Sequence, residues 1–345
     1  MRSAAATKVV IDCDPGVDDA LAVAFALGSP ELEVLGITTV AGNVPVERAT
    51  GNALRLREFL GAHRVPVVPG SPRALVRDGP ERTGRAHGPS GLGAAVLPEP
   101  VLPAADGHAA DFLAETVRSS PGEVILIAIG PLTNVALALR REPRITGWTR
   151  GVVVLGGSHA PVGPGSPAVP VPVPVSGGAG DGDGTAPGSA PPAGTAPEFN
   201  LAADPEAAAA VFGADWTVTA IGLDVSGRVR AGAAVRERMR ALGRLGRELL
   251  LPGLEHYGGA RGDDPDQGPP VHDACAVARV LDPGVVPAVP ARVTVDTGGP
   301  ETAGTTVTVH RPDGPAGALV ATGVDTGRFW ELALAAYGRL AARLG

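Results

Sequence analysis

Four aspartates lie close together near the start of the chain, at Asp12, Asp14, Asp18 and Asp19. The first pair ends an apolar stretch, residues 8–13, and two positions apart on a strand they point to the same side. A Pro-Gly turn follows. The second pair then falls in the first turn of a helix, whose partial positive charge favours carboxylates. Carboxylates that converge repel one another, so they need a cation, raised pKa values or exposure to water.

A divalent cation is the solution that suits this segment best. The end of a buried strand is shielded from water, and hard cations prefer oxygen ligands. Calcium tolerates a crowded carboxylate site better than magnesium does. The alternative is a helix cap, in which one aspartate bonds the helix and the others face water. A single Asp-Gly turn would favour the cap, whereas the whole acidic segment favours the metal site.

Alternating strand-like and helix-like segments position this cluster. Strands are predicted at residues 8–13, 32–40, 65–68, 123–129, 151–155 and 217–223, and the first helices at 17–27, 46–60, 105–117 and 132–139. Continuous Val/Ile runs are typical of strands covered on both faces. The pattern predicts an α/β fold, with a mostly parallel central sheet flanked by helices. Such sheets bind ligands at the carboxyl ends of their strands.

The second half continues with further helices and two extended segments. A helix starts after Asp204 at the N-cap and Pro205 at the first helical position. Later helices are predicted at residues 231–251, 272–281 and 326–344, and extended segments at 291–296 and 305–310. Residues 161–197 interrupt the pattern, since about half of them are Gly or Pro. Their composition predicts a disordered insertion, with a lid over the site as the alternative.

Composition excludes several classes of protein. The 345 residues carry a net charge of −7, which argues against a nucleic-acid partner. Two cysteines, Cys13 and Cys275, are too few for a disulfide framework. No apolar run approaches the roughly 20 residues of a membrane span, and the first residues do not resemble a signal peptide. A cytoplasmic protein without a membrane partner is expected.

Eight blocks of sequence carry a family resemblance. They lie, in order, at residues 11–20, 37–43, 87–93, 130–134, 154–157, 198–200, 204–208 and 271–277. In content and order they resemble the inosine–uridine-preferring nucleoside hydrolases. The resemblance implies a single Rossmann-like nucleoside hydrolase domain over residues 1–345. It also implies Ca²⁺ as cofactor, a homo-oligomer (dimer or tetramer), and hydrolysis of ribonucleosides to ribose and free base.

The resemblance also implies catalytic and metal-binding residues. Asp14, Asp19, Asp273 and the backbone carbonyl of Ile129 would bind calcium, a set that suits its preference for oxygen ligands. Asp14 would also be the general base on a calcium-bound water. His272 would donate a proton to the departing base or contact it.

Further residues would hold the nucleoside. By resemblance, Asp18 and Asn43 grip ribose hydroxyls, and Glu198 and Asn200 hold the 5′- and 3′-hydroxyl side of the sugar. Other candidates for the contact to the base are His256, Tyr257 and His87. His87, in a Gly-rich loop, is taken as a substrate-binding residue.

Two departures from the family pattern leave questions open. An Asn that relatives use near the 5′ end of the sugar is absent around Pro192, and residues 251–270 are Gly- and Asp-rich, so the base preference stays undetermined. A non-catalytic or altered member that binds nucleosides is therefore an alternative. An Asp-nucleophile phosphohydrolase also begins with an acidic strand end, but it requires a lysine further along the chain. The only lysine here is Lys8, which excludes that class.

Overall fold

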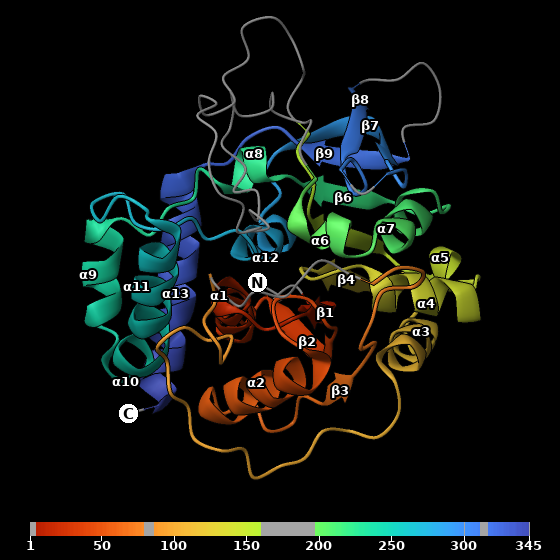
Figure 1. The fold of residues 1–345 in the computed structure, drawn as a ribbon. Coiled ribbons are helices and arrows are strands. Elements are labelled where there is room, and N and C mark those ends of the chain that lie inside the picture. The colour runs from red at the N-terminus through yellow and green to blue at the C-terminus, as the bar shows by residue number, and fades with distance from the viewer. Residues whose placement is uncertain (1–4, 79–85, 160–196, 300, 311–316, 345) are drawn as a thin grey trace, which may run out of the picture.

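A nine-stranded sheet forms the centre of the computed structural model, which describes residues 5–78, 86–159, 197–299, 301–310 and 317–344. The strands follow the order β3-β2-β1-β4-β5-β6-β9-β7-β8 (Figure 1). Their bounds are β1 (Thr7–Cys13), β2 (Leu32–Thr39), β3 (Val67–Pro69), β4 (Val124–Ala128), β5 (Gly151–Leu155), β6 (Val218–Ile221), β7 (Ala288–Val295), β8 (Thr306–His310) and β9 (Ala318–Ala321). The pairs from β3 to β9 are parallel, and β7 runs antiparallel to β9 and β8. The predicted mostly parallel sheet is confirmed.

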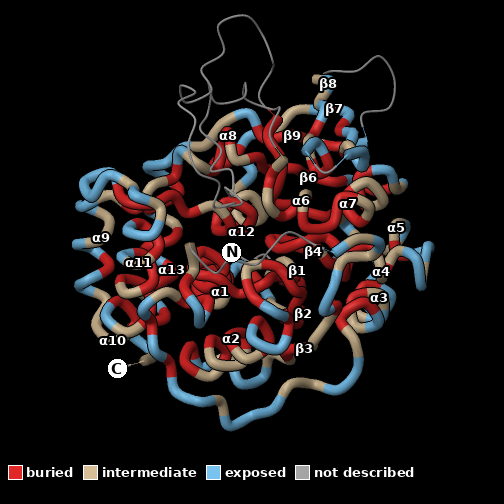
Figure 2. The backbone as a smooth tube through the Cα atoms, in the orientation of Figure 1, coloured by how far each residue is buried: buried red, intermediate tan, exposed pale blue. Residues whose placement is uncertain are grey.

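Helices cover both faces of the sheet. One layer contains α1 (Val17–Leu27), α2 (Val46–Phe59), α12 (Ala274–Leu281) and α13 (Thr326–Leu344), and the other contains α3 (Ala109–Ser119), α4 (Thr133–Arg141) and α7 (Pro205–Phe212). Strand β1 serves both layers: Val9 and Ile11 join one core and Val10 joins the other. Buried residues accordingly follow the sheet and the inner sides of the helices (Figure 2).

Most predicted elements form close to their predicted bounds, and α1, β5 and α13 match them. The predicted helix at 231–251 is wrong as a single element. The chain there forms α9 (Ala233–Arg240), α10 (Gly243–Leu245), a π-helical turn η1 (Gly246–Leu250) and α11 (Leu251–Arg261). Gly243 has a φ of +57°, a left-handed conformation that ends the preceding helix. Pro252 lies in the first turn of α11, directly after the π-helical turn, and it has no backbone N–H to donate there.

Four short elements were not predicted: α5 (Ile145–Trp148), α6 (Phe199–Ala203), α8 (Leu223–Ser226) and β9. Residues 222–223, predicted as the end of a strand, instead lead from β6 into α8. The expectation of a disordered insertion at 161–197 falls outside the described residues, except for Pro197. Among the described residues, no helix is long and apolar enough to cross a membrane.

Candidate active site

The predicted site residues gather at the carboxyl ends of the central strands. Asp14 follows β1, Asn43 follows β2 and Ile129 follows β4. Hydrogen bonds join these strand ends to one another. The backbone N–H of Asn43 donates to Asp14 Oδ2 at 2.5 Å, and Asn200 Nδ2 donates to the Ile129 carbonyl at 3.0 Å. The rule that places ligands at this edge of a parallel sheet therefore agrees with the geometry.

Asp14 is fully buried, with one oxygen bonded and one not. Its Oδ2 accepts from Asn43, whereas Oδ1 has no hydrogen-bond partner among the described residues. Two glycines make room for the carboxylate. A Cβ at Gly42 would lie 1.9 Å from Oδ2, and one at Gly130 would lie 2.6 Å from Oδ1. A buried carboxylate oxygen with no donor is costly, and a cation or a bound hydroxyl relieves that cost.

Asp19 has both a capping role and a place in the acidic cluster. Its Oδ2 accepts from the backbone N–H of Gly16 at 2.9 Å and from Asn43 Nδ2 at 3.2 Å. Its Oδ1 accepts from the backbone N–H of Asp14 at 3.2 Å. The helix-cap alternative thus applies to Asp19, but the capping bonds do not remove the side chain from the cluster.

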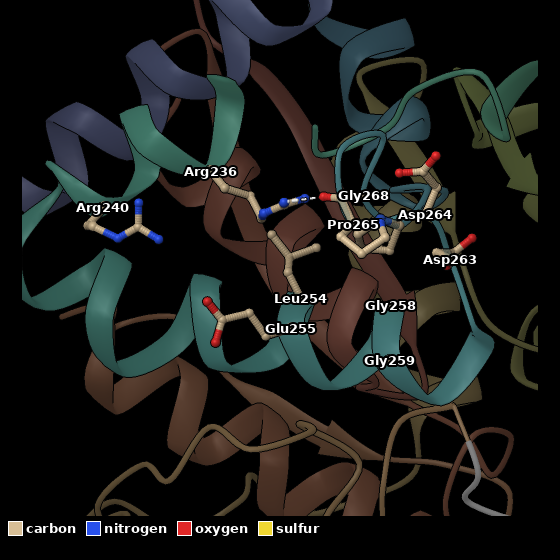
Figure 3. Close-up of a pocket in the computed structure, with 11 residues that line it drawn as sticks. Arg236, Arg240, Leu254, Glu255, Gly258, Gly259, Asp263, Asp264, Pro265 and Gly268 are labelled. Atoms are coloured by element: carbon tan, nitrogen blue, oxygen red, sulfur yellow. Dashed lines mark hydrogen bonds between the residues drawn. The ribbon is translucent and has the colours of Figure 1, made fainter. Parts of the chain in front are cut away.

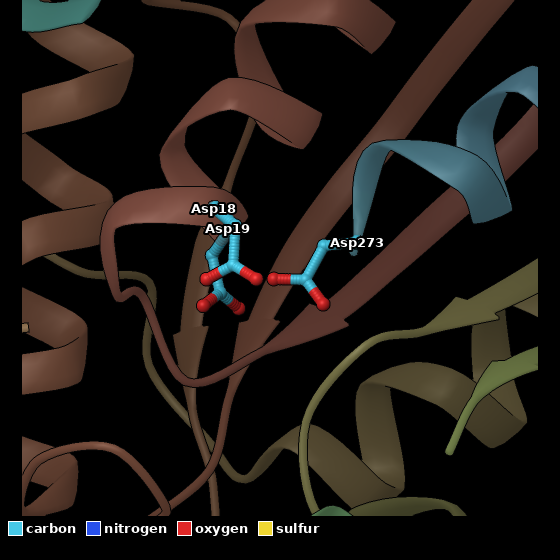
Figure 4. A group of neighbouring side chains, drawn as sticks. All are labelled: Asp18, Asp19 and Asp273. Carbon is cyan, nitrogen blue, oxygen red and sulfur yellow. The ribbon is translucent and has the colours of Figure 1, made fainter. Parts of the chain in front are cut away.

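Three carboxylates from two distant segments converge (Figure 4). One oxygen each from Asp18, Asp19 and Asp273 lies within 4.8 Å of the others. Asp273 lies at the start of α12, and its side chain makes no capping hydrogen bond there, so the helix-cap role does not explain it. Asp14 was expected in this trio and Asp18 on the ribose. The convergent trio instead contains Asp18, with Asp14 beside it.

The electrostatics of the cluster favour a cation. Burial first, and the charges of neighbouring carboxylates second, raise the pKa of Asp14 and of Asp273 well above the usual range. The same two causes raise the pKa of Asp19 to about 7. These groups cannot all be ionised at neutral pH without a compensating positive charge. Convergent carboxylates with an unbonded buried oxygen are the donor set of a hard divalent cation, so the residues fit a metal site.

Asp12 holds the end of β1, next to the cluster, through side-chain hydrogen bonds. Its Oδ1 accepts from Thr38 Oγ1 at 2.6 Å and from Asn134 Nδ2 at 2.8 Å, which ties β1 to β2 and α4. Burial raises the pKa of Asp12 to about 7. Asn134 also donates to the Thr39 carbonyl at 2.9 Å, so it fixes two strand ends at once.

Glu198 and Asn200 lie at the start of α6, close to the end of β5. The Glu198 carboxylate accepts three backbone hydrogen bonds, from Asn200 at 3.0 Å and from Leu201 and Gly157 at 3.1 Å. Burial raises the pKa of Glu198, and these backbone donors oppose that rise. Asn200 Nδ2 donates to the carbonyls of Ile129 and Leu155, leaving its Oδ1 as an acceptor. Asn200, which is expected to hold the sugar, therefore also contacts the Ile129 carbonyl oxygen, which is expected to bind calcium.

His272 and His87 border the acidic cluster from two further segments. His272 Nδ1 lies 2.9 Å from Ser226 Oγ, and burial lowers the pKa of His272 to about 4. His87 Nδ1 accepts from the backbone N–H of Val17 at 3.0 Å, so its ring proton is on Nε2. Burial also lowers the pKa of His87, so both rings are neutral at pH 7.

Helix α11 places an aromatic and a charged side chain next to His87. The ring of Tyr257 lies 5.0 Å from that of His87, and the Arg261 guanidinium lies 5.1 Å from the Tyr257 ring. Asp263 pairs with Arg261 at 3.0 Å and with Arg230 at 2.6 Å. Ser226, Arg230 and Arg261 were not predicted from the sequence. They come from segments without a motif, so no local pattern could have indicated them.

His256, the third candidate for a contact to the base, lies next to Tyr257 on α11. Its Nε2 is buried and has no hydrogen-bond partner among the described residues. A Cβ at Gly88 would lie 2.9 Å from that nitrogen, so the ring packs against the loop that carries His87.

A separate cavity of about 330 Å³ lies between α9, α11 and the loop that follows α11 (Figure 3). Its lining includes Arg236, Arg240, Glu255, Asp263 and Asp264, and none of the predicted site residues. Asp263 is the residue that the cavity shares with the Arg230 and Arg261 pairs.

Comparisons with known proteins point to one family. The family model "Inosine-uridine preferring nucleoside hydrolase" matches residues 9–331. An inosine-uridine preferring nucleoside hydrolase of Leishmania major is 35% identical over 337 residues, covering 96% of this chain and 98% of that protein. A pyrimidine-specific ribonucleoside hydrolase, RihA, of Salmonella gallinarum is 34% identical, covering 95% and 97%. The solved structure of a purine-preferring ribonucleoside hydrolase from Gardnerella vaginalis superposes with a TM-score of 0.82 at 31% identity, covering 97% of this chain and 99% of that one.

Proposed function

The chain belongs to the inosine-uridine preferring nucleoside hydrolase family, an enzyme family that acts on N-glycosyl bonds, and on that premise we propose how this site hydrolyses ribonucleosides. Asp14 is the general base that activates the attacking water beside a calcium ion. The observation that carries this assignment is the buried Oδ1 of Asp14, which has no partner among the described residues while Oδ2 is held by Asn43. That oxygen is fixed in place and free to accept a proton.

The ligands that we propose for calcium are Asp14, Asp19, Asp273 and the carbonyl of Ile129, with Asp18 close enough to join them. Calcium takes six to eight oxygens, roughly, so water and ribose hydroxyls fit in the remaining positions. When bound, the ion neutralises the acidic cluster and makes a nearby water more acidic. Asp273 lies far along the chain from Asp19, so a bound ion would also join α12 to α1.

The reaction is a displacement at C1′ of the ribose. Asp14 takes a proton from the water, the water oxygen bonds to C1′, and the C1′–N bond breaks with its electron pair passing to the base. Positive charge develops on the sugar in such glycosidic cleavages. The surrounding carboxylates of Asp18, Asp19 and Asp273 stabilise that charge in a site shielded from water.

The sugar is held from two sides. Asp18 and Asn43 bond the ribose hydroxyls near the ion, Glu198 bonds the 5′-hydroxyl, and Asn200 bonds the 3′ side through its Oδ1, since its Nδ2 donates to two carbonyls. A site built to bond hydroxyls rejects sugars that lack them, because its buried polar groups are then left unpaired. Ribonucleosides are therefore preferred over their deoxy analogues.

The departing base lies against His272, Tyr257 and His87. The lowered pKa of His272 leaves the ring neutral, and Ser226 Oγ, 2.9 Å from its Nδ1, donates to the Gly222 carbonyl at 3.1 Å. When this hydroxyl turns from the carbonyl to Nδ1, the ring proton is on Nε2, which then donates to the base. The base leaves with the electron pair, is stabilised by that bond, and takes up a proton from water. His87 offers a second Nε2–H on the same side.

Two further proposals, on domain organisation and oligomeric state, rest on family membership alone. Residues 1–345 act as one hydrolase domain, and the protein assembles into a dimer or tetramer, which light scattering measures directly.

A ribose-release assay over a panel of purine and pyrimidine ribonucleosides tests the proposed reaction. Free ribose is expected from at least one nucleoside, is lost with a calcium chelator, and returns when calcium is restored. The relatives are named for inosine-uridine, pyrimidine and purine substrates, so the panel covers both base classes. A folded, calcium-loaded protein that releases ribose from none of them is a nucleoside-binding member without this activity.

A further inference from the structure

The turn between β5 and the following loop contains two adjacent glycines beside Glu198. The N–H of Gly157 donates to Glu198 Oε2 at 3.1 Å. A Cβ on Gly156 would lie 3.0 Å from the same oxygen, so the backbone approaches the carboxylate closely. The peptide group between these glycines is therefore one of the three backbone donors that orient Glu198.

His159 holds the other side of that peptide group. Its Nε2 lies 3.1 Å from the carbonyl oxygen of Gly156, and its side chain is 1% exposed. A carbonyl oxygen can only accept, so Nε2 carries the proton and donates. Nδ1 lies 2.9 Å from Thr308 Oγ1 and accepts from it in the neutral ring. The backbone N–H of His159 donates to Asp224 Oδ1 at 2.9 Å, which anchors the residue itself.

Glu198 and His159 contact the same rigid peptide group, the one between Gly156 and Gly157. The C=O of Gly156 and the N–H of Gly157 belong to the same planar peptide and point in opposite directions. With no Cβ on either side, such a plane can turn over at little steric cost, and Gly157 already has a φ of +77°. A turned plane would present the carbonyl oxygen to the Glu198 carboxylate, replacing a donor with a repelling acceptor. The bond from His159 opposes that rotation.

Among the described residues, the hydrogen bonds to Glu198 leave one acceptor position for a ligand. A carboxylate offers about four lone-pair positions. Oε2 uses two of them for Leu201 and Gly157, and Oε1 uses one for Asn200. The remaining position on Oε1 points correctly only while the donors to Oε2 stay in place.

We propose that His159 is a positioning residue for Glu198: through the Gly156–Gly157 peptide, it keeps the free acceptor of Glu198 directed at the 5′-hydroxyl of the nucleoside. This inference rests on the proposed role of Glu198 in holding that hydroxyl. A merely structural role is the competing explanation, since His159 also links the end of β5 to Thr308 on β8. Under the positioning role, the effect of substituting His159 depends on the 5′-hydroxyl of the substrate. Under a structural role it does not.

Comparison of a ribonucleoside with its 5′-deoxy analogue separates them. His159→Leu removes the donor and keeps an apolar group of similar size in the buried position. We expect kcat/KM for the ribonucleoside to fall about tenfold, mainly through KM, with the 5′-deoxy analogue changed less than about twofold. His159→Gln is the matched control, because its amide places an N–H near the position of Nε2, and it should restore most of the preference.

Glu198→Gln, measured on the same two substrates, provides the reference. It should abolish the preference for the 5′-hydroxyl. If it leaves the preference unchanged, the role of Glu198 is wrong and the inference falls with it. If Glu198→Gln abolishes the preference while His159→Leu affects both substrates equally or neither, the inference alone is overturned.

Thr308→Val is a second variant should His159→Leu not fold. It keeps the volume of the side chain and removes the hydroxyl that donates to Nδ1 of His159. A loss of kcat/KM that is smaller than in His159→Leu and confined to the substrate with the 5′-hydroxyl supports the inference. An equal effect on both substrates overturns it.

Discussion

Two groups of buried carboxylates border the same site, and they are stabilised in different ways. Glu198 accepts three backbone hydrogen bonds, so its charge is compensated by the fold itself. Asp14 accepts one on Oδ2 and none on Oδ1 among the described residues, and three further carboxylates lie around it. Burial raises the pKa in both places. The difference teaches that burial alone does not indicate a cation site, whereas a deficit of donors among convergent carboxylates does.

The acidic cluster and Glu198 should respond differently when calcium is removed. The acidic cluster should depend on calcium and pH, because only a cation or protons balance its charges. The Glu198 carboxylate should not depend on calcium, because its hydrogen-bond donors are backbone N–H groups of the chain. The variants below are ordered by the size of the expected effect.

Asp14→Asn should have the largest effect. Removing the general base is expected to lower kcat by about 10³-fold in the ribose-release assay. The melting temperature without calcium should stay the same or rise, because the variant removes a carboxyl group whose raised pKa costs the cation-free fold stability at neutral pH. Asp106→Asn, at an exposed position, is the matched control and should keep full activity. Retained activity in Asp14→Asn would disprove the base assignment.

Calcium removal should come next, with an effect that grows with pH. The pKa of Asp19 is about 7 in the cation-free fold and near 3.8 in the unfolded chain. The cation-free protein therefore loses stability as pH rises from about 4 to 7, since the folded state retains a proton that the unfolded chain has released. Calcium displaces that proton, and saturation at about 1,000 times the dissociation constant adds about 4 kcal/mol.

Thermal melting with calcium and with a chelator measures this linkage. The difference between the two melting temperatures should be larger at pH 8 than at pH 5. An equal difference at both values would show that the ion does not displace protons from the cluster.

Glu198→Gln should have a smaller effect and a different signature. The amide turns an N–H₂ group toward backbone donors, so the unfolding free energy should fall by about 1–2 kcal/mol. The dissociation constant for calcium, measured by calorimetry, should stay within about twofold of that of the unmodified protein, because Glu198 is not one of the proposed ligands. A large loss of calcium affinity would remove the distinction between the two carboxylate groups.

Ser226→Ala should have the smallest effect, confined to the leaving group. Without the hydroxyl, the His272 ring loses its hydrogen bond at Nδ1, and turnover of ribonucleosides should fall about tenfold. 4-Nitrophenyl riboside has a leaving group that needs no hydrogen-bond donor, so its turnover should hardly change. Equal losses on both substrates would indicate a general structural role.

The sequence predicts the parallel part of the fold well and its connections poorly. Strands β1 and β5 and helices α1 and α13 show clear apolar periodicity, and their bounds were predicted closely. The four-residue strand β9 (Ala318–Ala321) has too short a pattern to distinguish it from a loop. The break after α9 depends on the left-handed conformation of Gly243, and a glycine in a helical pattern does not by itself indicate a break.

The same limit applies to the site. The Asp12–Asp19 segment indicates a cation because strand, turn and helix positions bring its carboxylates together. Which of them converge with Asp273 depends on the packing of α12 against α1, and the spacing of the aspartates within the segment does not report that. His159 and Ser226 act through single hydrogen bonds to residues far along the chain or in the backbone, so no motif marks them.

A crystal structure of the protein with calcium, with the ion located by anomalous scattering, tests the central claim most directly. The account predicts one ion about 2.3–2.6 Å from carboxylate oxygens of Asp14, Asp19 and Asp273 and from the carbonyl oxygen of Ile129. An ion held by Asp18, Asp19 and Asp273 with Asp14 out of reach, or no ion at this edge of the sheet, would contradict it.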